Sequence, residues 1–280
     1  MSAVKSDAGP TPGKVVGAIT RGTTNPNRLR RCDRWLAGPQ AWRLRAPTAA
    51  PIVVDLGYGA SGVTARELRD RLRRIRPDVE VVGIEIDPAR VAAAQPLAGE
   101  GLTFQRGGFE IPLPGGARPT IVRAFNVLRQ YGEQDVPSHW NLVRSRLAPH
   151  GLFVDGTCDE IGRRASWVAL TPAGPQTLTL AWRLRDLGDP AEIAERLPKA
   201  LIHRNVPGEP VHTFLTALAD AWVRAAPQAS YGARQRFIAT AGAVAAAGWP
   251  LRHTHRWRLG ELTVDWAAVA PRDAQGVTRA

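Results

Sequence analysis

Short apolar runs alternate with longer amphipathic stretches between residues 51 and 156. Short apolar runs rich in Val and Ile predict buried strands, whereas apolar residues three or four apart predict helices. This alternation predicts a parallel sheet with helices on both faces, in which ligands bind beyond the carboxyl ends of the strands. The predicted strands are 51–56, 79–86, 102–106, 120–125 and 151–156, and the predicted helices are 63–75, 88–97 and 136–147.

The pattern changes after residue 160. We predict a hairpin from 166–170 and 177–184, a mostly helical region over about 190–247, and strands at 252–258 and 262–268. The helical region is the best candidate for a lid over an acceptor, because the core sheet is complete without it. The expected division is a disordered leader at 1–13, a basic helical segment at 14–45, an α/β core at 46–160, a hairpin and helical insertion (the expected acceptor lid) at 161–250, terminal strands at 251–270 and a flexible tail at 271–280.

A basic amphipathic helix is predicted over 26–37, ahead of the core. Asn25 suits its N-cap, Pro26 suits its first position, and Gly38 with Pro39 suits its end. Its apolar face is formed by Leu29, Cys32, Trp35 and Leu36, and its basic face by Arg28, Arg30, Arg31 and Arg34. The basic face either contacts only solvent or lies toward a substrate or cofactor, and both possibilities stay open.

The charge of the chain is strongly basic, with 37 Lys and Arg against 25 Asp and Glu, a net charge of +12. All but three of these cations are arginines, whose planar guanidinium matches phosphate. An arginine excess therefore points to a nucleic acid or phosphorylated partner. A GC-rich genome gives the same excess together with abundant Ala, Gly and Pro, so composition does not decide for nucleic acid.

Other protein classes are disfavoured by what the sequence contains. Cys32 and Cys158 lie far apart and outside any Cys/His cluster, which argues against a disulfide framework or a zinc site. We expect no metal and a reducing, cytoplasmic location. No apolar run reaches the length of a signal peptide or a membrane span, so no membrane partner is expected.

The strongest chemical signal is the loop DLGYGASG, from Asp55 to Gly62, between the first predicted strand and helix. Gly57 and Gly59 lack a Cβ atom, so the main chain can turn sharply and approach a ligand, and Gly62 permits tight packing at the helix start. Glu85 ends the second strand, where a carboxylate can accept both hydroxyls of a ribose.

Asp55 separates two cofactor classes that use this layout. A dinucleotide places its pyrophosphate at the helix N-terminus, where an additional acid is unfavourable. S-adenosylmethionine has no phosphate and carries an ammonium and a sulfonium, so an acid near the loop is favourable. The sequence thus favours S-adenosylmethionine.

The segment 51–157 resembles the class I S-adenosylmethionine-dependent methyltransferases, because Asp55, Gly57, Gly59 and Gly62 match the first motif of that family and Glu85 matches its next acidic position. The resemblance implies a Rossmann-like seven-stranded sheet, closed by the terminal strands, in an enzyme that uses S-adenosyl-L-methionine. It implies that Glu85 binds the ribose and that Ile86 flanks the adenine. The implied cofactor-binding residues are Asp55, Gly57, Tyr58, Gly59, Gly62, Glu85, Ile86, Phe109 and Asn126.

The chain departs from the family pattern in three places. Gly107–Glu110 stand where an Asp commonly recognises adenine, so backbone groups or Glu110 are expected to do so. Thr120 replaces an Asp that often begins the fourth strand, and Arg123 interrupts the apolar run of that strand. These departures leave catalytic detail open.

Residues beyond the fourth and fifth strands point toward the mouth of such a site. Methyl transfer from a sulfonium is an in-line displacement that depends on alignment and exclusion of water, and a hydroxyl acceptor also needs a base. The catalytic candidates are Asn126, Arg129, Tyr131 and Asp159, with Gln130, Cys158, Glu160 and His139 nearby. They form no diagnostic set.

Three functions follow from these observations. The leading hypothesis is methylation of a small molecule enclosed by the insertion and the N-terminal helix. The second is an RNA methyltransferase that uses the basic helix 26–37. The third is a non-catalytic S-adenosylmethionine-binding protein. The absence of an Asn/Asp-Pro-Pro-Tyr/Phe run and of a Pro-Cys pair disfavours DNA methylation. No oligomeric state is indicated.

Overall fold

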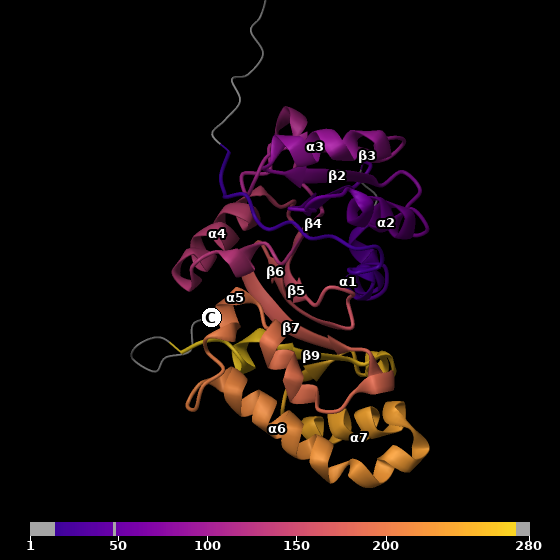
Figure 1. Ribbon diagram of the computed structural model, residues 1–280, viewed down its shortest axis with the longest axis vertical. Helices are drawn as coiled ribbons and strands as arrows, with labels where there is room; N and C mark the ends of the chain where they lie inside the picture. Colours follow the sequence, from indigo (N-terminus) through magenta and orange to yellow (C-terminus); the bar gives the residue numbers. More distant parts are fainter. Residues whose placement is uncertain (1–14, 47–48, 273–280) are drawn as a thin grey trace, which may run out of the picture.

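The computed structural model describes residues 15–46 and 49–272, and its strands form one nine-stranded sheet in the order β3-β2-β1-β4-β5-β6-β7-β9-β8 (Figure 1). The predicted leader at 1–13 and most of the predicted tail lie outside the described residues. The predicted count of seven strands is wrong, because the hairpin that follows the core joins the same sheet as two additional strands.

Five parallel strands form the first half of the sheet. They are β1 (Ile52–Leu56), β2 (Glu80–Glu85), β3 (Leu102–Arg106), β4 (Ile121–Phe125) and β5 (Leu152–Cys158). Their order, β3-β2-β1-β4-β5, is that of a doubly wound Rossmann-like fold. The Rossmann-like α/β prediction is confirmed.

Helices cover both faces of this parallel half, as predicted. Val53 and Val54 of β1 belong to separate apolar clusters on opposite faces, because successive strand residues alternate in direction. Helix α2 (Val63–Leu72) packs Leu68 and Leu72 into the cluster of Val53. Helix α4 (Val136–Arg146) packs into the other, and the short helix α3 (Pro88–Ala94) follows β2.

Four antiparallel strands form the second half. The hairpin of β6 (Arg164–Thr171) and β7 (Gly174–Trp182) pairs directly with β5, and β9 (Glu261–Asp265) pairs with β7. The terminal strands therefore extend the sheet beyond the hairpin rather than closing it beside β5.

The strand predicted at 252–258 is wrong. Only Leu251–Arg252 (β8) pairs with β9, and Thr254–Leu259 form a 3-10 helix. His253 has φ 55°, a left-handed conformation that ends the strand. Arg256 is buried and forms a bidentate pair with Glu261, which holds the turn.

The insertion is mostly helical, as predicted. It contains 3-10 helix Pro190–Arg196, α5 (Lys199–Ile202), α6 (Pro210–Arg224) and α7 (Ala233–Ala246). Helices α6 and α7 lie over the antiparallel end of the sheet (Figure 1), where Phe237 of α7 contacts Trp182 of β7 at a ring-centroid distance of 5.4 Å.

Helix α1 (Arg30–Leu36) is shorter than predicted. Residues 26–29 form turns and Asn27 has φ 60°, so the helix cannot begin at Pro26. Asn25 does not cap it, since its Nδ2 donates instead to the carbonyl of Glu160 at 3.1 Å. The predicted apolar face is confirmed as buried, and Trp35 packs edge-on against Trp167 of β6.

Candidate functional site

Two neighbouring cavities lie at the carboxyl ends of β1, β2 and β4, the edge that the sequence predicts. The first encloses about 510 Å³ between its atoms and the second about 290 Å³, part of each open to solvent. Gly57 and Thr20 line both cavities, so the two join into one elongated groove.

The glycine loop forms the floor where the cavities meet. Gly57 has φ 68° and Gly59 has φ 85°, conformations that other residues adopt only with strain. A Cβ atom on Gly59 would lie 2.6 Å from the carbonyl oxygen of Gly22, and one on Gly57 would lie 2.6 Å from Val127 Cγ2. Close backbone approach is therefore required here. Gly62 likewise packs its helix start against Phe104.

Glu85 is buried at the end of β2 and lines the second cavity. Its Oε2 accepts from the backbone N–H of Gly59 at 2.9 Å, and its Oε1 accepts from Ile86 N at 2.9 Å and Asp87 N at 3.4 Å. A carboxylate has about four acceptor positions, so Glu85 keeps capacity for a ligand hydroxyl.

The second cavity is walled by apolar side chains. Ile86, Phe109 and Val127 line it, and Tyr131 packs edge-on against Phe109 with ring centroids 5.5 Å apart. The ring of His139 packs at an angle against the same two rings, with its centroid 4.3 Å from that of Phe109 and 4.8 Å from that of Tyr131. This recess suits a flat, apolar ring.

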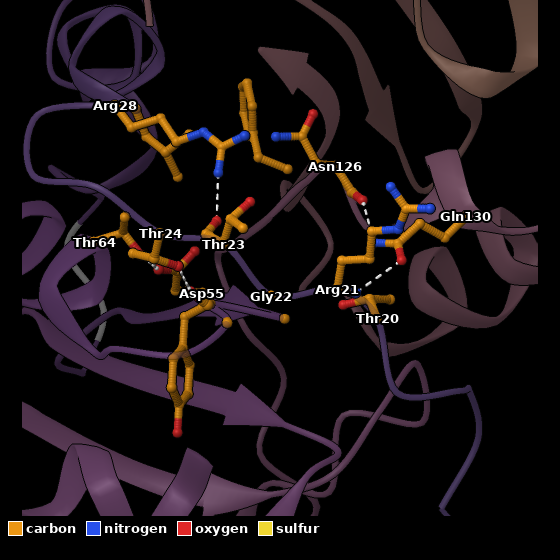
Figure 2. Close-up of a pocket in the computed structure, with 15 residues that line it drawn as sticks. Thr20, Arg21, Gly22, Thr23, Thr24, Arg28, Asp55, Thr64, Asn126 and Gln130 are labelled. Atoms are coloured by element: carbon orange, nitrogen blue, oxygen red, sulfur yellow. Dashed lines mark hydrogen bonds between the residues drawn. The ribbon is translucent and has the colours of Figure 1, made fainter. Parts of the chain in front are cut away.

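Residues 15–24, here termed the N-terminal strap, run across the groove (Figure 2). Gly22 O accepts from Ala60 N at 2.8 Å, and Thr24 Oγ1 donates to Tyr58 O at 2.7 Å. Further along, Ala18 N donates to the hydroxyl of Tyr131 at 2.6 Å. The strap thereby bridges the loops after β1 and β4.

The strap is fixed at two further points. Arg21 N donates to Gln130 Oε1 at 2.8 Å, and Val16 N donates to Glu110 Oε2 at 2.8 Å. Glu110, expected to recognise adenine, thus contacts the strap and the backbone N–H of Gly108.

Asp55 lies at the carboxyl end of β1 beside a buried ion-pair network. Its Oδ1 accepts from Arg123 Nε at 3.0 Å, and its Oδ2 contacts Arg123 Nη2 at 2.7 Å and Thr64 Oγ1 at 2.9 Å. Arg123 also binds Asp33 of α1, which in turn pairs with Arg71 of α2 at 2.6 Å. Burial opposes the charge of Arg123, but Asp55 and Asp33 outweigh it and raise its pKa.

This network explains the arginine that interrupts the fourth strand. Arg123 and Asp33 are fully buried, and a buried charge is tolerated only when it is paired. The network fastens α1 to β1 and β4 behind the first cavity. Asp33 is a residue that sequence analysis missed. Its signal was an acid on the apolar face of α1 matched by an arginine inside an apolar strand.

The loops after β4 and β5 meet at Asn126, which lines the first cavity and has φ 59°. Asn126 Oδ1 accepts from Cys158 N at 3.0 Å, and its Nδ2 lies 3.5 Å from the sulfur of Cys158. Burial raises the pKa of the Cys158 thiol. Arg28 lies across the cavity from Asn126 (Figure 2), held by the carbonyls of Asp159 and Thr23.

The other catalytic candidates occupy different positions. Tyr131 lines the second cavity, whereas Arg129 and Asp159 line neither cavity. Arg129 donates to the carbonyl of Glu195 at 2.7 Å, and the carboxylate of Asp159 accepts from the backbone N–H of Arg163 and Arg164. Sequence analysis also missed the strap, whose Thr20, Thr23 and Thr24 line the first cavity, because residues 15–24 carry no periodic pattern.

Two further absences hold for residues 15–46 and 49–272. They contain no group of three or more His, Cys, Asp or Glu arranged to hold a metal ion. No helix among them is long and apolar enough to cross a bilayer. Cys32 and Cys158 are both free.

No protein-family model and no curated protein matches the sequence. Among solved structures, the chain is similar to the CcbJ methyltransferase from Streptomyces caelestis, at 22% identity and a TM-score of 0.34, over 52% of this chain and 69% of that one. It is also similar to the magnesium protoporphyrin IX methyltransferase ChlM from Synechocystis PCC 6803 with bound SAH, at 19% identity and a TM-score of 0.36, over 46% and 54% of the two chains. A third match is LepI in complex with SAM, at 18% identity and a TM-score of 0.34, over 42% and 30%.

The matched part spans about two thirds of the CcbJ chain and about half or less of the other two.

Proposed function

We propose that the protein is an S-adenosyl-L-methionine-dependent methyltransferase that methylates a small molecule. The observation that carries this proposal is the elongated groove at the carboxyl ends of β1, β2 and β4. It joins an apolar recess, a buried carboxylate and a polar cavity over a glycine loop, in that order.

The residues along the groove match the parts of this cofactor in the order in which they are joined. The recess of Ile86, Phe109 and Val127 takes the adenine, and Glu85 takes the ribose hydroxyls. The backbone of Gly57 and Gly59 approaches the amino-acid part in the first cavity. The bound cofactor supplies an electrophilic methyl group on a sulfonium.

The chain's own contribution is alignment and exclusion of water. Asn126 is held by Cys158 in the lining of the first cavity, where it positions an acceptor through its side chain. The strap covers the groove and narrows its entrance, which favours a small acceptor over a base in a folded RNA. We assign Asp55 an indirect role, because Arg123 and Thr64 already use its oxygens. We assign Tyr58 and Gly62 the role of holding the glycine loop in its conformation.

The role of the insertion at 161–250 as an acceptor lid stays a prediction. So do the catalytic roles of Arg129 and Asp159. Helices α6 and α7 line neither cavity, so we expect the strap rather than those helices to act as the lid. The cytoplasmic location also stays a prediction.

The direct test is incubation with methyl-labelled S-adenosylmethionine and fractionated host lysate, with Gly59→Arg as the matched inactive control. We expect label in the small-molecule fraction with wild type only. Label confined to RNA would contradict the proposed acceptor class.

A non-catalytic binding protein is the second candidate. It is favoured by one observation: Asp55 and Asn126, the polar side chains beside the glycine loop, are already hydrogen-bonded within the protein. Tight cofactor binding with no label transferred to any fraction would support this candidate.

A further inference from the structure

A second cleft, separate from the groove, lies on the outer side of α1. It encloses about 1,290 Å³ between its atoms, part of it open to solvent, and it shares no lining residue with either cavity of the groove. Its walls come from α1, the turn between β5 and β6, the segment after β7, the start of α7 and the 3-10 helix before β9. We term it the basic cleft.

Arginines from all of these elements converge on the basic cleft. Of the residues that the structure describes, seven arginines and a single acid line it; the acid is Glu261, whose oxygens already accept from Arg256. The seven are Arg30, Arg31, Arg34, Arg163, Arg183, Arg234 and Arg258. Segments more than 200 residues apart in the sequence are thus folded to gather one sign of charge in one concave place.

One of these arginines fixes the geometry of the basic cleft. Arg31 Nε donates to Gly162 O at 3.2 Å and its Nη1 donates to Leu259 O at 3.4 Å, which ties α1 to the turn between β5 and β6 and to the 3-10 helix before β9. Burial, then the neighbouring Arg30 and Arg34, lower the pKa of Arg31 against the opposing effect of Glu261.

Five of the seven have their guanidinium groups available. Within residues 15–46 and 49–272, no carboxylate pairs with Arg30, Arg34, Arg163, Arg234 or Arg258, and all five side chains are exposed. By contrast, many arginines elsewhere on the surface pair with an acid, as Arg73 does with Glu100. Unpaired like charges repel one another, so their convergence is unfavourable unless an anion joins them.

We propose that the basic cleft binds a phosphorylated small molecule through at least two phosphate groups. A concave surface with one sign of charge concentrates the opposite charge, and guanidinium groups match phosphate oxygens in pairs. Arg34 of α1 and Arg258 of the 3-10 helix before β9 engage separate phosphates. The proposal does not rest on methyl transfer.

The lining distinguishes a small ligand from a nucleic acid. None of the described residues that line the basic cleft is aromatic, whereas proteins that bind single strands stack bases on aromatic side chains. The non-arginine lining is Asn27, Ile161, Gly162, Leu184, Leu259 and Glu261. The basic cleft therefore offers contacts to phosphate without a platform for bases.

The test is calorimetric titration with inorganic pyrophosphate at low and at physiological salt. Wild type is expected to bind with one site, and Arg34→Ala/Arg258→Ala is expected to bind at least about 10-fold more weakly. The matched control is Arg66→Ala/Arg74→Ala, which removes two exposed arginines on and after α2 and leaves the same net charge. This control is expected to bind as wild type does.

Titration with S-adenosylhomocysteine accompanies each variant, and unchanged affinity for it shows that the groove and the fold are intact. Equal pyrophosphate affinity in both double variants would overturn the proposal, as would no binding to wild type. If an RNA oligonucleotide displaces pyrophosphate, the logarithm of its binding constant falls with the logarithm of salt concentration by about 0.7 for each phosphate contacted. Displacement with a slope that corresponds to several phosphates would identify nucleic acid as the partner instead.

Discussion

The parallel and antiparallel halves of the sheet differ in the direction of their strands, and therefore in which loops they bring together. In the parallel half, all strands end at one edge, so the loops after β1, β2 and β4 meet and build the groove. In the antiparallel half, successive strands reverse direction, so their connections divide between two edges. Strand direction, more than composition, decides where chemistry gathers.

Two buried acids of the parallel half are held in different ways. Asp55 of β1 lies against Arg123, whereas the carboxyl of Asp155 of β5, among the described residues, accepts only from the Nε1–H of Trp140, at 3.0 Å. Both are almost fully buried. Asp55 has a cationic partner, and burial raises the pKa of Asp155 to about 7.

The largest effect is expected from Arg123→Leu. Removing this cation leaves buried Asp55 with only the hydroxyl of Thr64 and buried Asp33 with only Arg71, which costs about 3–5 kcal/mol of the free energy of unfolding. Urea denaturation at pH 7.5 measures this. The exposed Arg74→Leu is the control and is expected to change stability by less than about 0.5 kcal/mol. Equal stability of the two variants would mean that the network does not support the parallel half.

Asp155→Asn tests how the buried acid that has no cationic partner among the described residues changes the stability of the protein with pH. The carboxyl binds its proton more tightly in the folded protein, with a pKa of about 7, than in the unfolded chain at 3.8. That stabilisation is fully present below about pH 4 and is lost as pH rises to about 7, up to about 4 kcal/mol in all. Between pH 4.5 and 8, the free energy of unfolding of Asp155→Asn, measured by urea denaturation, is expected to fall far less than that of wild type. Parallel pH profiles of wild type and Asp155→Asn would contradict this, and exposed Asp220→Asn is the control.

Glu85→Gln tests the ribose assignment in the parallel half. The amide offers one acceptor oxygen in place of two, so affinity for S-adenosylhomocysteine is expected to fall about 10-fold, or about 1.4 kcal/mol. Glu80→Gln changes an exposed acid at the other end of the same strand and is expected to leave affinity unchanged. If both variants bind alike, Glu85 does not contact the ligand.

The smallest effect is expected from Tyr131→Phe, which removes the hydroxyl that accepts from Ala18 N. Loss of this bond costs about 0.5–1.5 kcal/mol, and we expect the strap to open more often and ligand to dissociate several-fold faster. Stopped-flow release of S-adenosylhomocysteine measures the rate. Tyr231→Phe, at an exposed side chain, is the control. An unchanged release rate in Tyr131→Phe would exclude the strap as a lid.

The local pattern of the sequence was sufficient to predict the strands of the parallel half, but not to predict how the antiparallel strands pair. Hydrophobic periodicity located β1 to β5, and the glycine loop with Glu85 located the groove. Each of these signals is carried by a few consecutive residues and can be recognised without knowing the tertiary structure. Pairing partners are set by contacts far apart in the chain, so the junction of β5 with β6 and the place of β9 could not be inferred locally. The strap is similar: residues 15–24 gain their position from Tyr131, Gln130 and Glu110.

The basic helix illustrates the same limit. Sequence left open whether its arginines face solvent or a ligand. The fold divides them: Arg28 borders the first cavity, while Arg30, Arg31 and Arg34 line the basic cleft. Only the tertiary positions of Arg163, Arg234 and Arg258 make that cleft visible.

Calorimetric titration of S-adenosylhomocysteine into wild type, Gly59→Arg and Gly115→Arg tests the central claim most directly. Both glycines have positive φ, at 85° and 62°, but a side chain on Gly59 would enter the groove, whereas Gly115 faces open space. The account predicts one-site binding to wild type and Gly115→Arg, and a loss of at least about 100-fold in Gly59→Arg. Undiminished binding to Gly59→Arg, with its fold intact by circular dichroism, would contradict it.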